Sequence, residues 1–106
     1  MKASQHLAAA RDEIEKGWTQ GTLQDNAGNV CAVGALKRVA DTNQPTQLDE
    51  FVEVATAGNG AATALSMMAK EFGAMSIMGF NDTRASKEDV LAWFDKSIAG
   101  LEERGE

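Results

Sequence analysis

The most distinctive stretch of this chain is GWTQGTLQDNAGNVCAVGAL, which runs from Gly17 to Leu36. It joins a tryptophan between glycines, a polar tract dense in asparagine, aspartate and glycine, and the single cysteine of the sequence. Asparagine and glycine accept the positive φ angles that tight turns require. Residues 22–31 are therefore predicted to form a short hairpin or tight loop, and a helix is predicted from about Ala32 to Asp41.

Gly34 lies inside that predicted helix, although a glycine there costs about 1 kcal/mol relative to alanine. Its missing side chain predicts that another backbone or a bulky ring approaches closely, and we expect this ring to be Trp18. The inward face of the helix is expected to carry Ala32, Ala35, Leu36 and Val39.

Upstream of the stretch, residues 3–16 are predicted to form an amphipathic helix. Leu7, Ala10 and Ile14 recur there at helical spacing, with charged residues on the remaining faces. Gly17 is well placed to end this helix, because glycine is favoured just past a helix C-terminus.

Downstream, apolar periodicity predicts three more helices. Thr46 and Asp49 form a capping pair ahead of the first, and residues 61–72 form the second. Ser86 and Asp89 form another capping pair ahead of the last. The inward residues are expected to be Leu48, Phe51, Val52 and Ala55 in the first helix, Leu65, Met68 and Phe72 in the second, and Val90, Leu91, Phe94, Ile98 and Leu101 in the last.

The segment before the last helix has a different pattern. Over residues 74–80, Met75 and Ile77 alternate with small or polar residues, which predicts an extended buried stretch. The polar residues at 81–85 are then expected to form a loop.

Length and composition bound the fold and the partners. The chain has 106 residues, the size of one domain, and we expect residues 1–106 to form a compact, mostly α domain of about five helices with a short hairpin or small sheet. The formal net charge of −6 argues against direct nucleic-acid binding, which needs clustered lysine and arginine. No apolar run approaches the roughly 20 residues of a membrane span, so we expect no membrane insertion and a cytoplasmic protein.

Two blocks of the sequence carry a family resemblance. The first is GWxQG at 17–21, leading through DxxG at 25–28 to CAVGAL at 31–36. The second is FND at 80–82, followed by DVL at 89–91. In order and composition these blocks resemble a family of small proteins from actinobacteria and their phages whose function is not established. The resemblance implies no activity, but it favours a phage-related protein that acts on a host component.

Cys31 is the main candidate for catalysis. At the start of a helix, backbone N–H groups and the helix dipole can lower the pKa of a thiol. His6, the only histidine, would serve as the base, with Asp25 or Asp82 orienting it. The simpler interpretation, which we favour, is a small buried cysteine and a solvent-facing histidine near the N-terminus.

Polar residues in the turn and in the second block point to binding sites. Asp25 lies among oxygen donors that could bind calcium, but the twelve-residue pattern and final glutamate of an EF-hand are missing, so we expect a turn and no metal site. Asn81 and Asp82 either shape a local loop or form one side of a polar rim around a binding groove. The other side of that rim would be Trp18, Gln20 and Asp25.

A second candidate surface involves Trp93. Both tryptophans are most simply core residues, but the neighbours of Trp93 already fill an inward face, which favours an exposed interface residue. Methionines add flexible apolar surface that suits a partner protein or a second copy of the chain in a homodimer. These methionines are Met67, Met68, Met75 and Met78.

These patterns leave three function classes. One histidine, one cysteine, no nucleotide-binding loop and no cluster of metal ligands favour a non-enzymatic module without a cofactor, which binds a protein of an actinobacterial host. The alternatives are a small cysteine-dependent enzyme that uses Cys31 and His6, and an acidic DNA mimic that blocks a DNA-binding protein.

Overall fold

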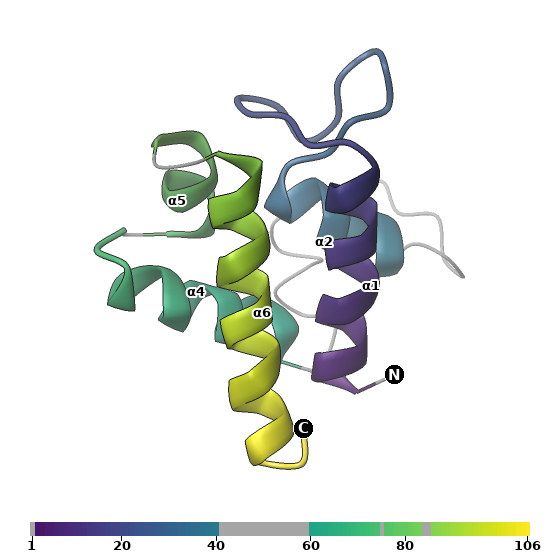
Figure 1. The fold of residues 1–106 in the computed structure, drawn as a ribbon. Coiled ribbons are helices and arrows are strands. Elements are labelled where there is room, and N and C mark those ends of the chain that lie inside the picture. The colour runs from purple at the N-terminus through teal and green to yellow at the C-terminus, as the bar shows by residue number, and fades with distance from the viewer. Residues whose placement is uncertain (1, 41–59, 75, 84–85) are drawn as a thin grey trace.

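Five helices make up the described part of the chain, which comprises residues 2–40, 60–74, 76–83 and 86–106 of the computed structural model (Figure 1). They are α1 (Ala3–Lys16), α2 (Ala32–Ala40), α4 (Ala61–Glu71), α5 (Ile77–Thr83) and α6 (Lys87–Glu103). The mostly α fold predicted from the sequence is confirmed. The helix predicted after residue 46 lies outside the described residues. None of the five helices combines the length and the apolar character that a membrane crossing requires.

α1 and α6 form the central pair and run side by side in opposite directions (Figure 1). Leu7, Ala10 and Ile14 of α1 are fully buried, as their spacing predicts. α6 begins at the predicted capping box, in which Ser86 Oγ accepts the Asp89 N–H at 3.2 Å and Asp89 Oδ2 accepts the Ser86 N–H at 3.3 Å. The helices α2 and α4 pack against this pair.

Aromatic side chains fill the space between α4, α5 and α6. Trp93 is fully buried, and its ring centroid lies 4.5 Å from that of Phe80. Its indole N–H donates to the Leu65 carbonyl at 3.0 Å. The simplest interpretation of Trp93, a core residue, is therefore confirmed, and the alternative of an exposed interface residue is wrong, because α6 packs against α1 on one side and against α4 and Phe80 on another. Met67, in contrast, stays 64 % exposed on α4.

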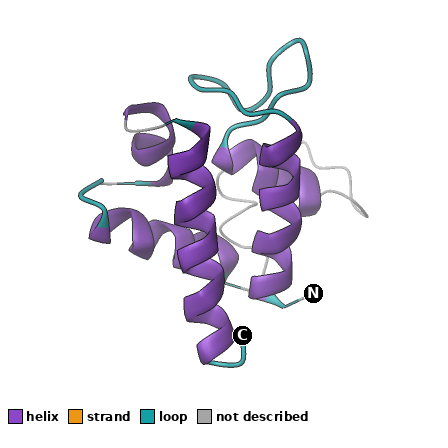
Figure 2. Ribbon diagram, viewed as in Figure 1, coloured by secondary structure: helices purple, strands orange, loops and turns teal. Residues whose placement is uncertain are grey.

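The loop between α1 and α2 extends beyond the helices in two lobes, at the top of the view in Figure 2. Val30 forms two isolated bridges, parallel to Trp18 and antiparallel to Gln24, and the described residues include no strand beyond them. Gly28 lies at φ +90°, in the left-handed region that favours glycine. Across the turn, the Asp25 N–H donates to the Asn29 carbonyl at 3.0 Å and the Cys31 N–H donates to the Leu23 carbonyl at 3.1 Å. The predicted short hairpin or tight loop is therefore confirmed.

The segment predicted as an extended buried stretch leads into α5 instead. Ser76 caps this helix, because its Oγ accepts the backbone N–H three residues further on at 2.9 Å. Ile77 and Phe80 then lie three residues apart on one buried face. The loop predicted over residues 81–85 is also wrong at its start, because α5 continues to Thr83.

Candidate functional site

The two sequence blocks meet at Asn81 of α5. Its side chain is fully buried. The Oδ1 atom accepts hydrogen bonds from the indole Nε1 of Trp18 at 2.9 Å and from the backbone N–H of Ala32 at 3.0 Å. The Nδ2 atom donates to the carbonyl of Thr19 at 3.2 Å and to Oδ1 of Asp82 at 2.8 Å. We call these five residues the Asn81 clasp.

The clasp fixes the orientation of the Asn81 amide and uses all of its hydrogen-bonding positions. An asparagine amide offers two lone pairs on oxygen and two N–H donors. Both groups at Oδ1 are N–H donors, and both groups at Nδ2 are oxygen acceptors. If the amide were flipped, Nδ2 would face the two N–H donors and Oδ1 would face the two oxygen acceptors. Asn81 therefore joins the loop after α1, the first turn of α2 and α5, and it has no capacity left for a ligand.

A polar edge lies beside the clasp on the surface. The Nε2 of Gln20 donates to the Asn81 carbonyl at 2.9 Å, and the N–H of Gly21 donates to Oδ1 of Asp82 at 3.1 Å. Trp18 is half-buried at this edge, where the clasp holds its indole nitrogen. We call Trp18, Gln20 and Asp82 the rim. Four of the six predicted binding residues thus lie together, whereas their role in binding stays a prediction.

Only one of the two carboxylate oxygens of Asp82 accepts hydrogen bonds from the described residues. Its Oδ1 accepts from Gly21 and Asn81, whereas its Oδ2 makes no hydrogen bond or ion pair with any described residue. Asp82 also lies in the last turn of α5, where a helix dipole disfavours negative charge. The fold therefore needs an oxygen acceptor at position 82, and it does not need a charge there.

Asp25 belongs to the turn and not to the rim. Its Oδ1 accepts the N–H groups of Ala27 at 3.0 Å and Asn29 at 2.9 Å, and its Oδ2 accepts from Nδ2 of Asn29 at 2.9 Å. These hydrogen bonds, with the Asn29 side chain first, lower the pKa of Asp25. Arg38 braces the same turn by donating to the Gly28 carbonyl at 2.9 Å. The predicted turn is confirmed, and the carboxylate of Asp25 is occupied within it.

Cys31 and His6 are both buried, and no hydrogen bond joins them in the described structure. The buried cysteine that we favoured is thus confirmed, whereas the solvent-facing histidine is wrong. Burial raises the pKa of Cys31 and outweighs the opposing hydrogen bonds from Gly34 and Val33 at the start of α2. The Nε2 of His6 lies 3.0 Å from the carbonyl of Leu36, five residues beyond Cys31. The helix position predicted to activate the thiol therefore does not do so.

The close approach predicted at Gly34 occurs, but its partner is not Trp18. A Cβ atom on Gly34 would overlap the backbone carbonyl of Leu23, which accepts the Cys31 N–H at 3.1 Å. Trp18 instead directs its indole nitrogen to Asn81. Gly34 therefore lets the loop lie directly against α2.

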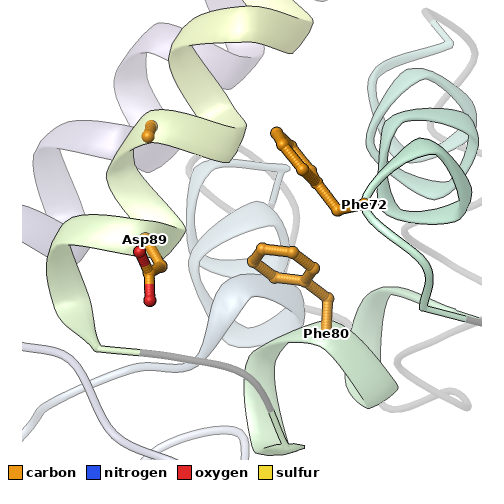
Figure 3. A pocket seen from close by; sticks show the side chains of 4 residues that line it. Phe72, Phe80 and Asp89 are labelled. Carbon is orange, nitrogen blue, oxygen red and sulfur yellow. The ribbon is translucent and has the colours of Figure 1, made fainter.

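An open groove of about 250 Å³ lies where α5, α6 and the end of α4 meet. The rings of Phe72 and Phe80 face each other there, across from Asp89 on α6 (Figure 3). Phe80 and Asp89 belong to the second block, but no described lining residue belongs to the first. The groove is therefore separate from the rim, and the two blocks do not share it.

Sequence reasoning missed part of the clasp. Two of its contacts come from backbone groups, namely the carbonyl of Thr19 and the N–H group of Ala32, and the N–H of Gly21 is a third backbone group, which donates to Asp82 at the rim. Backbone groups carry no signal in residue type, and only Gly21, at φ +79°, marks a special conformation. Among the described residues, no group of three or more histidine, cysteine, aspartate or glutamate side chains is placed to hold a metal ion.

Comparison with known proteins identifies a family without assigning an activity. No curated protein and no solved structure matches the chain. The model of a family of unknown function (DUF6197) matches residues 1–100, a range that contains both blocks, the clasp and the rim. Because this match covers nearly the whole chain, the protein belongs to the family of unknown function DUF6197.

Proposed function

We propose that this protein is a non-enzymatic protein-binding module whose contact surface is the rim of Trp18, Gln20 and Asp82. The observation that carries the proposal is the half-used carboxylate of Asp82. Its Oδ1 completes the clasp, whereas its Oδ2 makes no hydrogen bond with the described residues. An asparagine would serve the clasp equally well, so the charge at this position is available to a partner.

The rim has the composition and rigidity that favour protein recognition. A half-buried tryptophan lies beside polar groups, and tryptophan is enriched among the residues that contribute most to interface affinity. The clasp holds the backbone between Trp18 and Gln20 through the hydrogen bond from Asn81 to the Thr19 carbonyl. A partner would therefore meet a surface that needs little ordering, which lowers the entropic cost of binding.

We further propose that the protein is phage-related and that its partner is a protein of an actinobacterial host. The support for this source is the resemblance of the two sequence blocks to small proteins of actinobacteria and their phages. An actinobacterial lysate is therefore the place to search for the partner.

The test is a pull-down with mass-spectrometric identification, in which the tagged wild type is compared with Asp82→Asn. The matched control is Asp12→Asn on α1, because Asp12 is exposed and makes no hydrogen bond with the described residues. We expect one host protein to be captured by the wild type and by Asp12→Asn and to be lost in Asp82→Asn. Equal capture by all three proteins would contradict binding at the rim.

The same experiment separates this proposal from an acidic DNA mimic. Both substitutions reduce the formal net charge of −6 by one, so a mimic that depends on overall charge would respond equally to the two. Binding at the rim responds to one position alone.

The buried thiol disfavours a cysteine-dependent enzyme. Cys31 is fully buried and its pKa is raised, whereas a nucleophilic cysteine needs access and a lowered pKa. We expect iodoacetamide to label Cys31 slowly in the native protein at neutral pH and rapidly after unfolding in urea. Rapid stoichiometric labelling of the native protein would favour the enzyme.

A further inference from the structure

We infer that the rim recognises the guanidinium group of an arginine side chain presented by the partner. This inference rests on the proposed function and specifies the chemistry of the same surface. It follows from the two acceptor atoms that the fold leaves unused and from the aromatic ring that lies beside them.

The first unused acceptor is Oδ2 of Asp82, and the second is Oε1 of Gln20. The Nε2 of Gln20 is committed to the carbonyl of Asn81 at 2.9 Å, and this contact fixes which end of the Gln20 amide faces the protein. Neither Oδ2 nor Oε1 accepts a hydrogen bond from the described residues. Asn81 and Asp82 are adjacent in the chain, so both acceptors are anchored at one point of α5.

The aromatic component is Trp18. Its indole nitrogen and the carboxylate of Asp82 are held at opposite ends of the same Asn81 amide, at 2.9 Å and 2.8 Å. An aromatic ring near a carboxylate attracts a cation. Guanidinium suits this arrangement better than ammonium, because it is planar, stacks on aromatic faces and donates to two acceptors at once.

Two described lysines of α6 direct their charges away from Asp82. Lys87 donates to the carbonyl of Glu15 at 2.6 Å, which directs its charge to the end of α1. Lys96 lies 5.3 Å from the ring centroid of Phe72, at the groove between α4 and α6. Neither of these two lysines is therefore the partner of the Asp82 carboxylate.

The test uses the peptide acetyl-Gly-Arg-Gly-amide and two-dimensional NMR of the ¹⁵N-labelled full chain. The sequence has two tryptophans, so only two indole N–H signals arise. The Trp93 indole is buried against Leu65 and serves as an internal control. We expect the peptide to shift the Trp18 indole and the Gln20 side-chain amide with a Kd of about 1–10 mM, typical of a single weak contact, and to leave the Trp93 indole unchanged.

Two comparisons make the test specific for charge. The peptide with citrulline in place of arginine has nearly the same shape without the charge, and we expect it to bind at least about tenfold more weakly. Asp82→Asn keeps both hydrogen bonds of Oδ1, and we expect the same loss of affinity for the arginine peptide. Gln20→Ala removes an exposed side chain outside the clasp and is expected to weaken binding by a smaller factor.

An equal response to the arginine and citrulline peptides, or an unchanged response in both Asp82→Asn and Gln20→Ala, would overturn the inference. Such a result is compatible with a host protein that is captured by the wild type and lost in Asp82→Asn. In that case the rim binds its partner through other chemistry and the proposed function stands. Equal capture by all variants contradicts the proposed function itself, whatever the peptide does.

Discussion

The α1–α6 pair and the Asn81 clasp are held together by different forces. The pair buries apolar faces over several turns and adds exposed ion pairs, such as Arg11 with Asp95 at 2.6 Å. The clasp depends on one buried amide with four directional hydrogen bonds. Apolar packing adapts to conservative changes, whereas a buried polar group without a partner costs about 1–3 kcal/mol. Of these two regions, we therefore expect the clasp, which assembles the rim, to be the more sensitive to single substitutions.

Asn81→Leu is expected to have the largest effect on stability. Leucine has a similar volume, but it leaves the Trp18 and Ala32 N–H groups and the Thr19 carbonyl without their partner. We expect the free energy of unfolding, measured by urea denaturation, to fall by about 4 kcal/mol.

The matched control in the helix pair is Ser97→Ala. Ser97 is also buried, but its Oγ donates to the Trp93 carbonyl of its own helix at 2.9 Å, and α6 retains that turn without it. We expect Ser97→Ala to cost less than about 1 kcal/mol. Similar losses for the two variants would remove the distinction between the regions.

Glycine-to-alanine substitutions are expected to change the free energy of unfolding in opposite directions in α2 and α6. In α2, a methyl group on Gly34 overlaps the Leu23 carbonyl, a backbone atom that cannot move unless the loop moves, so we expect a loss of about 2 kcal/mol. In α6, a methyl group on Gly100 meets only the end of the Arg104 side chain at 3.9 Å. Gly100→Ala should therefore raise the free energy of unfolding by up to about 1 kcal/mol. Thermal unfolding of both variants checks this, and changes of equal sign would count against the contact at Gly34.

The helix pair was more predictable from the sequence than the clasp. Leu7, Ala10 and Ile14 repeat at helical spacing, and the Ser86–Asp89 pair marks the start of α6 through contacts three residues apart. Both signals are local, so one sequence is enough to recognise them.

The clasp could be predicted only in part, because three of its four hydrogen bonds join residues 49 to 63 positions apart. The pairing of Trp18 with Asn81 depends on how α5 packs, and the sequence pattern predicts an extended stretch up to Phe80 and a loop after it in place of this helix. α5 has seven residues, too few for periodicity to distinguish helix from strand. The local signal that was available is Ser76, an N-cap residue followed by Ile77 and Phe80 at helical spacing.

Acid is expected to weaken the ion pair between Glu13 of α1 and Arg38, the residue that also binds the Gly28 carbonyl of the loop. The NH1 of Arg38 donates to Oε1 of Glu13 at 2.8 Å, and the hydrogen bonds from Arg38 and then Lys16 lower the pKa of Glu13. Because the pKa is lower in the folded state, ionised Glu13 stabilises the protein above its ordinary pKa, and this contribution is lost as the pH falls through the folded value. We expect the wild type to exceed Glu13→Gln by about 1 kcal/mol at neutral pH and the difference to disappear in acid. Urea denaturation of both proteins between pH 7 and about pH 3 measures it, and a difference independent of pH would exclude this pair as its cause.

Asp82→Asn is expected to have the smallest effect on stability. Asparagine keeps an oxygen acceptor for Gly21 and Asn81 and removes a negative charge from the end of α5. We expect a change within about 0.5 kcal/mol, whereas Asp82→Ala removes both hydrogen bonds and should cost about 1–2 kcal/mol. Equal losses in the two variants would show that the charge itself is structural.

The most direct test of the clasp is hydrogen exchange at the two indole N–H groups. Trp93 donates to the Leu65 carbonyl inside the core, and Trp18 donates to Asn81 at the edge of the fold. If the clasp holds the rim as described, both groups are protected and exchange only through openings that cost several kcal/mol. Exchange of the Trp18 indole at the rate of a free indole, while that of Trp93 stays protected, would contradict the account.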